Sequence, residues 1–163
     1  GVEELAKNIL TNKKNRDFEK MKRISRWTRE AGIETRAGFL VGLPGETPEL
    51  AKKTIQTAID LDPDYAQFTI CCPYPGTKLA NEIHEGKWGK FLTHELKEYN
   101  MWNVTWLPFG YKNAEELKNM ERYAFRKFYL RPSYIIKRIM KIRRFEDIKR
   151  YIKGGAALVR GFL

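Results

Sequence analysis

An apolar strand that runs directly into a turn rich in glycine and proline constrains this chain most. Residues 36–49 read RAGFLVGLPGETPE. The first half is continuously apolar, which is typical of a parallel strand covered on both faces. Glycine adopts a positive φ and lets another group approach the main chain closely. The turn is therefore either a compact strand-to-helix connection or the rim of a binding site, and spacing alone favours neither.

The segments around this turn predict an α/β fold with a parallel sheet. Residues 17–31 have helical periodicity. One face of that helix carries Phe18, Met21, Ile24, Trp27 and Thr28. Thr47 and Pro48 predict the start of a second helix that ends near Leu61, and residues 65–72, YAQFTICC, form a second strand. The order helix, strand, helix, strand indicates βα units joined by right-handed crossovers.

The second half of the chain is predicted to be mostly helical. We expect a short helix at residues 3–10, another at 78–86, a short strand near 101–105, and a helix at 113–131 that Asn113 caps. Two basic amphipathic helices follow. Their core-facing stripes are predicted to be Ile135, Ile139 and Ile142 on the first, and Phe145, Ile148 and Ile152 on the second. In a longer parent we expect these stripes to pack on other parts of that protein. We predict two units, residues 1–111 and 112–163.

Positive charge is concentrated at one end of the sequence. The 163 residues have a net charge of +11. Residues 1–112 hold 17 Lys and Arg against 15 Asp and Glu, whereas residues 113–163 hold 14 against 5. The basic part suits an acidic partner domain, a membrane surface or a nucleic acid.

The sequence lacks the signatures of several classes of protein. No apolar run approaches the roughly 20 residues that span a bilayer. The two cysteines, Cys71 and Cys72, are adjacent and cannot build a disulfide framework, so a reducing cytoplasmic location is expected. His84 and His94 have no second ligand at metal spacing and are predicted to be ordinary surface or partly buried histidines. We assign no catalytic and no metal-binding residue within the chain.

The stretch AGFLVGLPGETPE, followed by LDPDYAQFTICCPYPGT, resembles the C-terminal half of the radical S-adenosylmethionine (SAM) core. It is most similar to the cobalamin-binding branch of Fe-S oxidoreductases, which contains the anaerobic magnesium-protoporphyrin IX monomethyl ester oxidative cyclases. The resemblance implies part of a TIM-like (β/α)6 barrel, formed by residues 1–111. It implies a C-terminal helical extension for residues 112–163.

The resemblance also implies which residues contact SAM. Gly38, Leu40 and Gly42 match the fifth-strand motif of the family, where main chain and an apolar side chain lie against adenine. Phe68, Ile70 and the turn at 73–77 match the sixth-strand region that closes the rim, with core packing as the alternative for Phe68 and Ile70. The predicted cofactor-binding residues are Gly38, Leu40, Val41, Gly42, Leu43, Phe68, Pro73, Tyr74, Pro75 and Gly76.

One residue of the family motif is displaced. The motif places a glutamate three residues after its second glycine, but that position is Gly45, and Glu46 stands one place later. We therefore favour an ordinary role for Glu46 as a solvated acid near a helix N-terminus.

In the full-length parent the resemblance implies SAM, a [4Fe-4S] cluster and cobalamin. The CxxxCxxC loop that holds the family's cluster is absent from this sequence. We expect the chain to be a fragment that is inactive alone, holds no bound cofactor by itself, binds added SAM weakly or not at all, and has the N-terminal cobalamin and radical SAM portion as its partner. Homodimerisation through an exposed sheet edge is also expected.

An alternative hypothesis is that the chain is a non-catalytic binding module rather than part of an enzyme. The basic helices could form a module that binds an anionic membrane, a nucleic acid or a partner domain. We expect no nucleic-acid complex and keep peripheral membrane contact open.

Overall fold

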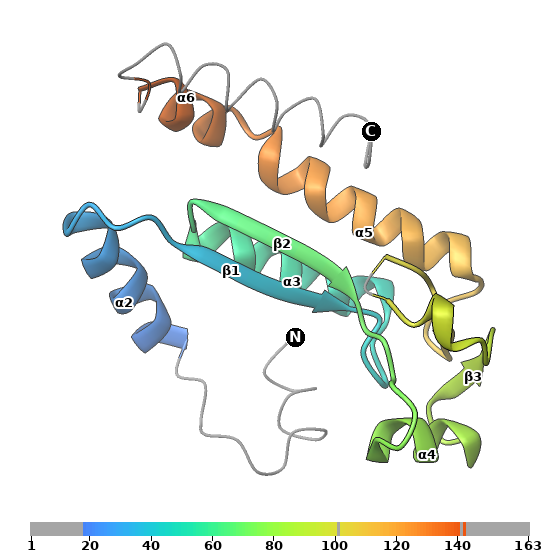
Figure 1. The fold of residues 1–163 in the computed structure, drawn as a ribbon. Helices are drawn as coiled ribbons and strands as arrows, with labels where there is room; N and C mark the ends of the chain where they lie inside the picture. Colours follow the sequence, from blue (N-terminus) through green and yellow to red (C-terminus); the bar gives the residue numbers. More distant parts are fainter. Residues whose placement is uncertain (1–17, 101, 141, 143–163) are drawn as a thin grey trace.

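The computed structural model of the chain describes residues 18–100, 102–140 and 142. Figure 1 shows its elements as ribbons. They are α2 (Phe18–Glu30), β1 (Arg36–Val41), α3 (Pro48–Leu61), β2 (Tyr65–Ile70), α4 (Lys78–His84), β3 (Gly89–Phe91), a 3-10 helix η1 (Leu96–Glu98), β4 (Trp106–Pro108), α5 (Ala114–Tyr129) and α6 (Pro132–Met140). The predicted α/β class is confirmed.

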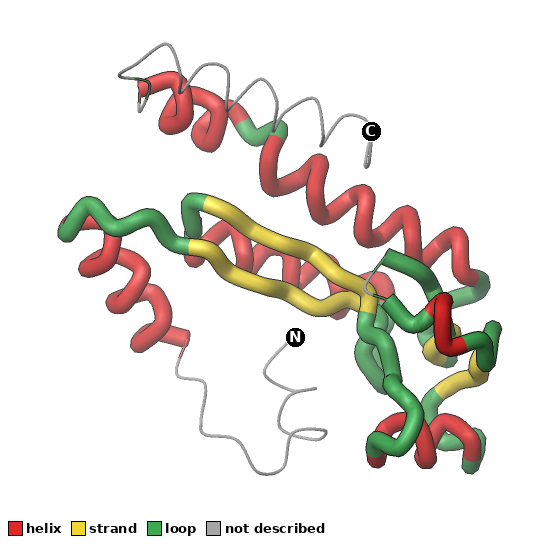
Figure 2. The backbone as a smooth tube through the Cα atoms, viewed as in Figure 1, coloured by secondary structure: helices red, strands yellow, loops and turns green. Residues whose placement is uncertain are grey.

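The centre of the fold is a two-stranded parallel sheet. β1 and β2 pair in register from Arg36 opposite Tyr65 to Val41 opposite Ile70, and α3 makes the crossover (Figure 2). Helices α3 and α5 pack on one face of this sheet, where aromatic rings meet. The ring of Phe68 lies 5.4 Å from those of both Phe39 and Phe125, measured between centroids.

The other face of the sheet is open. Burial alternates along both strands, so Phe39 and Val41 are buried while Gly38 and Leu40 are exposed. The expectation of a strand covered on both faces is therefore wrong for the described residues, because their helices α3 and α5 lie on one side.

The start and end of α3 follow the sequence prediction. The Thr47 hydroxyl accepts a hydrogen bond from the amide of Leu50 at 3.4 Å, and Pro48 occupies the first turn. The helix ends where Asp62 adopts φ 47°, a left-handed conformation that Asp tolerates better than most residues. The helix predicted at residues 17–31 is also confirmed as α2, and the one predicted at 3–10 lies outside the described residues.

A small hairpin replaces the strand predicted near residues 101–105. β3 and β4 pair antiparallel, from Gly89 opposite Pro108 to Phe91 opposite Trp106. Trp106 is fully buried, and its indole N–H donates to the carbonyl oxygen of Cys71 at 2.8 Å. The strand therefore forms where this tryptophan anchors the hairpin to the end of β2.

The two described C-terminal helices pack differently. The side chain of Asn113 accepts a hydrogen bond from the amide of Glu116 at 2.8 Å, so the predicted cap of α5 is confirmed. α5 buries apolar side chains against the sheet, whereas Ile135 and Ile139 of α6 are exposed. The predicted stripe of α6 does not pack on the described residues at these two positions, and its packing on the rest of a longer protein stays a prediction. The stripe predicted at residues 145–152 lies outside the described residues.

Larger assemblies of these elements stay predictions. The described elements form two separate two-stranded sheets and no closed barrel. The division into residues 1–111 and 112–163 also stays a prediction. Among the helices that the structure describes, none combines the length and apolarity needed to cross a bilayer.

Candidate functional site

The predicted rim lies where β1 and β2 end. The turn after β1 contains Gly42 and Gly45, whose φ values are 73° and 72°, in the region that favours glycine. A Cβ built on Gly42 would lie 3.0 Å from a methyl carbon of Leu117 on α5. Packing within the chain therefore requires Gly42 in addition to any role toward a ligand.

Glu46 is buried in this turn. Its exposed fraction is 0%. The Oε1 atom accepts hydrogen bonds from the amide of Gly42 at 2.6 Å and from the hydroxyl of Tyr111 at 2.8 Å. The prediction of a solvated acid is wrong, because the loop before α5 covers the turn. Gly110 lies so close that a Cβ there would be 2.0 Å from the carbonyl oxygen of Glu46.

The environment of Glu46 disfavours its charged form. Burial raises the pKa of the carboxyl group, and the hydrogen bonds from Gly42 and Tyr111 act in the opposite direction. The Oε2 atom is buried without a hydrogen-bond partner among the described residues. Burial also raises the pKa of Tyr111, with Glu46 as the next cause. The hydrogen bond from Tyr111 therefore joins this turn to the loop before α5.

The open face consists of alternate residues of the two strands. Gly38 is exposed, and a Cβ built on it would meet no atom within 4 Å. Leu40 is 44% exposed. The register sets Gln67 opposite Gly38 and Thr69 opposite Leu40. Gln67 and Thr69 were not predicted as site residues. The two-residue period of a strand places them on one face with Gly38 and Leu40 once the register is known.

Two predicted site residues point away from the open face. Val41 and Phe68 are both 0% exposed and belong to the core that α3 and α5 cover. Phe68 meets Phe39, Phe125 and Phe128 at ring-centroid distances of 5.4, 5.4 and 6.0 Å. This geometry matches the packing alternative for the Phe68 side chain. A ligand contact at either residue is still a prediction, which would involve the main chain.

The remaining predicted residues divide between core and rim. Leu43 packs beside the small cluster of Cys71, Ile83 and Trp106. In the turn after β2, Pro73 is buried, while the next three residues are exposed. These three are Tyr74, Pro75 and Gly76. The Tyr74 ring lies 6.3 Å from that of Tyr99, measured between centroids. The turn thus presents an aromatic side chain beside the carboxyl end of the sheet.

The cysteines near this rim do not form a metal site. Cys71 is buried, and burial is the main cause that raises its pKa to about 12. Cys72 lies 3.6 Å from the Thr105 hydroxyl, measured from its sulfur. In the part of the chain that the structure describes, no three His, Cys, Asp or Glu side chains are grouped to hold a metal ion. The rings of His84 and His94 stack at 5.7 Å between centroids, on the exposed surface.

A separate cleft lies at the opposite end of the sheet. It runs between α2 and the C-terminal end of α3. Charges of both signs line it, from Glu19, Lys22, Arg23, Arg26, Arg29, Asp60 and Asp62. The cleft is therefore distinct from the predicted rim, since Asp62 precedes β2.

Comparison with curated proteins identifies relatives of the chain. It is 37% identical over 128 residues to an uncharacterized methyltransferase of Pyrococcus horikoshii, covering 76% of the chain and 26% of the relative. It is 31% identical over 106 residues to the anaerobic magnesium-protoporphyrin IX monomethyl ester cyclase of Cereibacter sphaeroides, covering 65% and 16%. These proteins are homologues of the chain. The cyclase of Rubrivivax gelatinosus is 27% identical over 122 residues, covering 75% and 21%.

The predicted resemblance is thus confirmed, and the homologues are enzymes by name. The chain spans about a quarter or less of the length of these relatives. No protein-family model matches the sequence.

The implied cofactors can be tested against the described residues. Leu40 is exposed, and a Cβ on Gly38 would meet no atom within 4 Å, so the described residues leave room for a planar ring such as adenine there. An iron–sulfur cluster does not fit, because the described residues contain no suitable group of three ligands.

Proposed function

We propose that the chain supplies two adjacent strands of a radical SAM barrel, with the open face of β1 and β2 turned to the barrel interior. The observation that carries this proposal is the one-sided covering of the sheet: α3 and α5 pack on one face, and Gly38 and Leu40 are exposed on the other. In a (β/α) barrel the helices form an outer layer and the opposite face of the strands points inward. The homologous methyltransferase and cyclases support an enzyme of this kind.

The open face receives the adenosyl part of SAM in this proposal. Leu40 contacts the adenine ring, and the main chain at Gly38 leaves space for it. Gln67 and Thr69 offer polar groups at the edge of the ring. Bound SAM would supply a methyl group or an adenosyl radical, and the residues of this chain bind and orient it.

The rest of the enzyme's chemistry comes from other parts of a longer protein in this proposal. The described residues do not supply a cluster site, and the chain spans about a quarter or less of its relatives. We assign the [4Fe-4S] cluster and cobalamin to the N-terminal portion, which would be the chain's main partner. The reaction in this proposal is a methyl transfer or a cyclisation, the activities that the names of the homologues give. Alone, the chain is expected to be inactive.

Nuclear magnetic resonance (NMR) titration of the chain with SAM tests this assignment, because it detects weak binding to half of a pocket. We expect roughly millimolar affinity, with amide shifts at Gly38, Leu40, Gln67 and Thr69. A Leu40→Asp variant should abolish these shifts. Leu92→Asp is a matched control, since Leu92 is 43% exposed and Leu40 44%. Absence of shifts in β1 and β2, or shifts confined to the cleft between α2 and α3, would contradict the proposal.

Dimerisation through a sheet edge is a further proposal. Among the described strands, β1 pairs only with β2, so its other edge offers unpaired main-chain groups. Light scattering should detect a dimer that weakens when a proline replaces Arg36, because the bonds from Tyr65 to Thr35 and from Cys71 to Val41 place the main-chain N–H of Arg36 on the free edge of β1. A monomer at all concentrations would contradict it.

A further inference from the structure

The cleft between α2 and α3 has the size of a small-molecule site. Its volume is about 570 Å³, within the range of roughly 300–1,000 Å³ that ligand pockets occupy. Six of its nine lining residues belong to α2, and the other three form the C-terminal end of α3 and its cap. Only Leu61 among them is apolar, so a ligand of this cleft would be held mainly by polar and charged contacts.

Two of the three acids that line the cleft have partners on their own helices. The Glu19 carboxylate lies 3.6 Å from the Nζ atom of Lys22. Asp60 accepts a hydrogen bond from the side-chain amide of Gln56 at 2.8 Å. These contacts satisfy both acids without using the arginines of the cleft.

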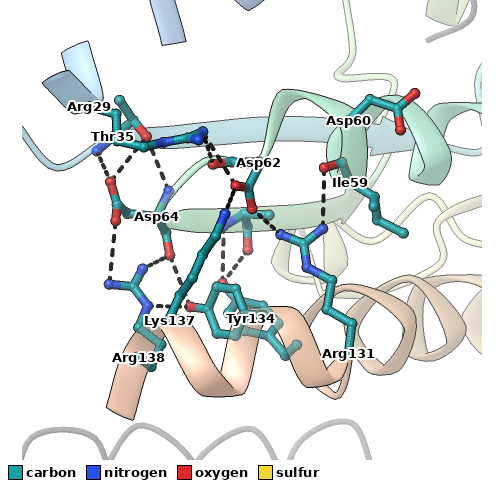
Figure 3. Close-up of polar contacts among 12 residues, drawn as sticks. Arg29, Thr35, Ile59, Asp60, Asp62, Asp64, Arg131, Tyr134, Lys137 and Arg138 are labelled. Atoms are coloured by element: carbon teal, nitrogen blue, oxygen red, sulfur yellow. Dashed lines mark hydrogen bonds and ion pairs between the residues drawn. The ribbon is translucent and has the colours of Figure 1, made fainter. Parts of the chain in front are cut away.

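The third acid, Asp62, is neutralised from the side of α6. Arg131 lies 2.6 Å from the Asp62 carboxylate, and Lys137 pairs with the same group, as Figure 3 shows. Arg29 of α2 adds a third cation at 3.4 Å. One carboxylate therefore meets three positive charges and does not compensate any further cation of the cleft.

The carbonyl groups at the end of α3 are also covered. A helix C-terminus carries partial negative charge, which repels anions. The Arg29 guanidinium donates to the carbonyl oxygen of Asp62 at 3.0 Å, and Arg131 donates to that of Ile59 at 3.3 Å (Figure 3). This end of α3 therefore repels an anion less than an uncovered helix end would.

Two arginines that line the cleft, Arg23 and Arg26, have no such partner. Within the part of the chain that the structure describes, neither guanidinium makes a hydrogen bond or an ion pair. They are three residues apart on α2, so they lie on neighbouring turns of one side of the helix. Ser25 brings a hydroxyl to the same cleft. The cleft thus holds two uncompensated positive charges and a neutral donor.

This set of donors suits a phosphate group. A guanidinium presents its N–H donors in one plane and binds phosphate oxygens in pairs. A phosphate monoester carries nearly two negative charges and three acceptor oxygens at neutral pH, which matches two guanidinium groups. A single carboxylate has one charge and two oxygens, so it would leave one of the arginines uncompensated.

We propose that the cleft between α2 and α3 binds a phosphate group between Arg23 and Arg26, as inorganic phosphate or as part of a small phosphorylated molecule. The Ser25 hydroxyl is a further donor to the same group. The proposal is independent of the SAM assignment, because SAM contains no phosphate and the cleft is distinct from the predicted rim.

NMR titration of the chain in a phosphate-free buffer tests this proposal. Inorganic phosphate and adenosine 5′-monophosphate (AMP) are added separately at constant ionic strength, and adenosine serves as the ligand without phosphate. We expect saturable shifts of the amides of Arg23, Ser25 and Arg26 with a dissociation constant of roughly 1 mM, and none with adenosine. Tighter binding of AMP than of inorganic phosphate would identify a small phosphorylated molecule as the ligand, and equal binding would identify phosphate itself.

Substitutions separate a site from general attraction of anions to a basic protein. The double variant Arg23→Gln/Arg26→Gln should weaken phosphate binding at least tenfold. The matched control is Lys52→Gln/Lys53→Gln, which removes two positive charges from exposed positions of α3 outside the cleft lining. This control should bind phosphate as the parent does, and circular dichroism checks that each variant is folded.

Four outcomes would overturn the proposal. The first is the absence of saturable shifts at Arg23 and Arg26 in the folded parent. The second is equal affinity of the arginine variant and the parent. The third is an equal loss of affinity in the lysine control, which would show attraction to net charge without a site. The fourth is adenosine binding in the cleft as tightly as AMP, which would show that the phosphate is not recognised.

Discussion

The two ends of the β1–β2 sheet hold acidic side chains in opposite ways. At the carboxyl end, Glu46 is fully buried and receives two hydrogen bonds from neutral donors, Gly42 and Tyr111. At the amino end, Asp62 is partly exposed and pairs with Arg29, Arg131 and Lys137. One acid is isolated from water and cations, and the other is surrounded by cations.

Because of this difference, the two ends of the sheet are sensitive to different changes. A buried carboxylate with few partners makes the turn that contains it sensitive to small changes in packing and to protonation. A partly exposed ion cluster tolerates loss of one charge and responds to salt instead. The predicted binding rim thus lies at the end built by close packing, and the attachment of α6 lies at the end built by charge.

Gly110→Ala is expected to cause the largest loss of stability among these substitutions, through the carboxyl end of the sheet. The added methyl group would lie 2.0 Å from the carbonyl oxygen of Glu46, so the loop or the turn must move. We expect a loss of about 3 kcal/mol in the free energy of unfolding, measured by urea denaturation. Gly38→Ala is the control and should change stability by less than about 0.5 kcal/mol, because no atom lies within 4 Å of its Cβ position. Equal effects of the two substitutions would contradict the close packing of Gly110 on Glu46.

Tyr111→Phe should have the next largest effect. The change removes one of the two donors to Oε1 of Glu46 and leaves a buried acceptor less satisfied. We expect a loss of about 2 kcal/mol in the free energy of unfolding. Tyr123→Phe on the outer side of α5 is the control, since Tyr123 is 40% exposed, and should be nearly neutral. A neutral Tyr111→Phe would show that the hydrogen bond does not hold the turn.

Glu46 should also give stability a pH dependence of unusual sign for an acid. Burial raises its folded-state pKa above the ordinary value of 4.5, so the folded chain holds this proton to higher pH than the unfolded chain. Its contribution to stability is fully present below pH 4.5 and is lost as the pH rises through the folded-state pKa. The difference in unfolding free energy between the parent and Glu46→Gln, measured from acid to neutral pH, should show this loss.

Glu49 provides the opposite control in the same turn of the chain. Hydrogen bonds from its own backbone N–H and from the Thr47 hydroxyl lower its pKa. Its contribution is therefore present above pH 4.5 and lost as the pH falls. A Glu46→Gln difference with the same slope as that of Glu49→Gln would mean that Glu46 is not desolvated.

Much of the fold could be predicted from local signals. Thr47, Pro48 and Asn113 mark helix starts through hydrogen bonds within a few residues, and the structure confirms them. Whether one face of a strand or helix is buried depends on elements that are distant in the sequence. Local sequence patterns do not predict those contacts. For this reason the exposed face of β1 and the exposed apolar residues of α6 were not predicted.

The candidate site shows the same limit. The residues Gly38 and Leu40 were selected from a motif, but Gln67 and Thr69 join them only through the register of the sheet. The burial of Glu46 depends on Gly110 and Tyr111, more than sixty residues away. The spacing of residues within the turn does not indicate this burial. The short-range rule that places acids at helix starts predicted a solvated Glu46 instead.

Asp62→Asn should have the smallest effect on the free energy of unfolding. It tests whether charge, rather than packing, stabilises the amino end of the sheet. Asn tolerates the left-handed conformation of Asp62, so the substitution removes charge and keeps the helix end. We expect a loss of about 0.5 kcal/mol in low salt, measured by urea denaturation, and almost none in 1 M salt, where charges more than about 3 Å apart are screened. Asp60→Asn is the control, because exposed Asp60 binds the neutral amide of Gln56 at 2.8 Å. A loss at Asp62 that does not depend on salt would mean that packing, as at Glu46, also governs this end.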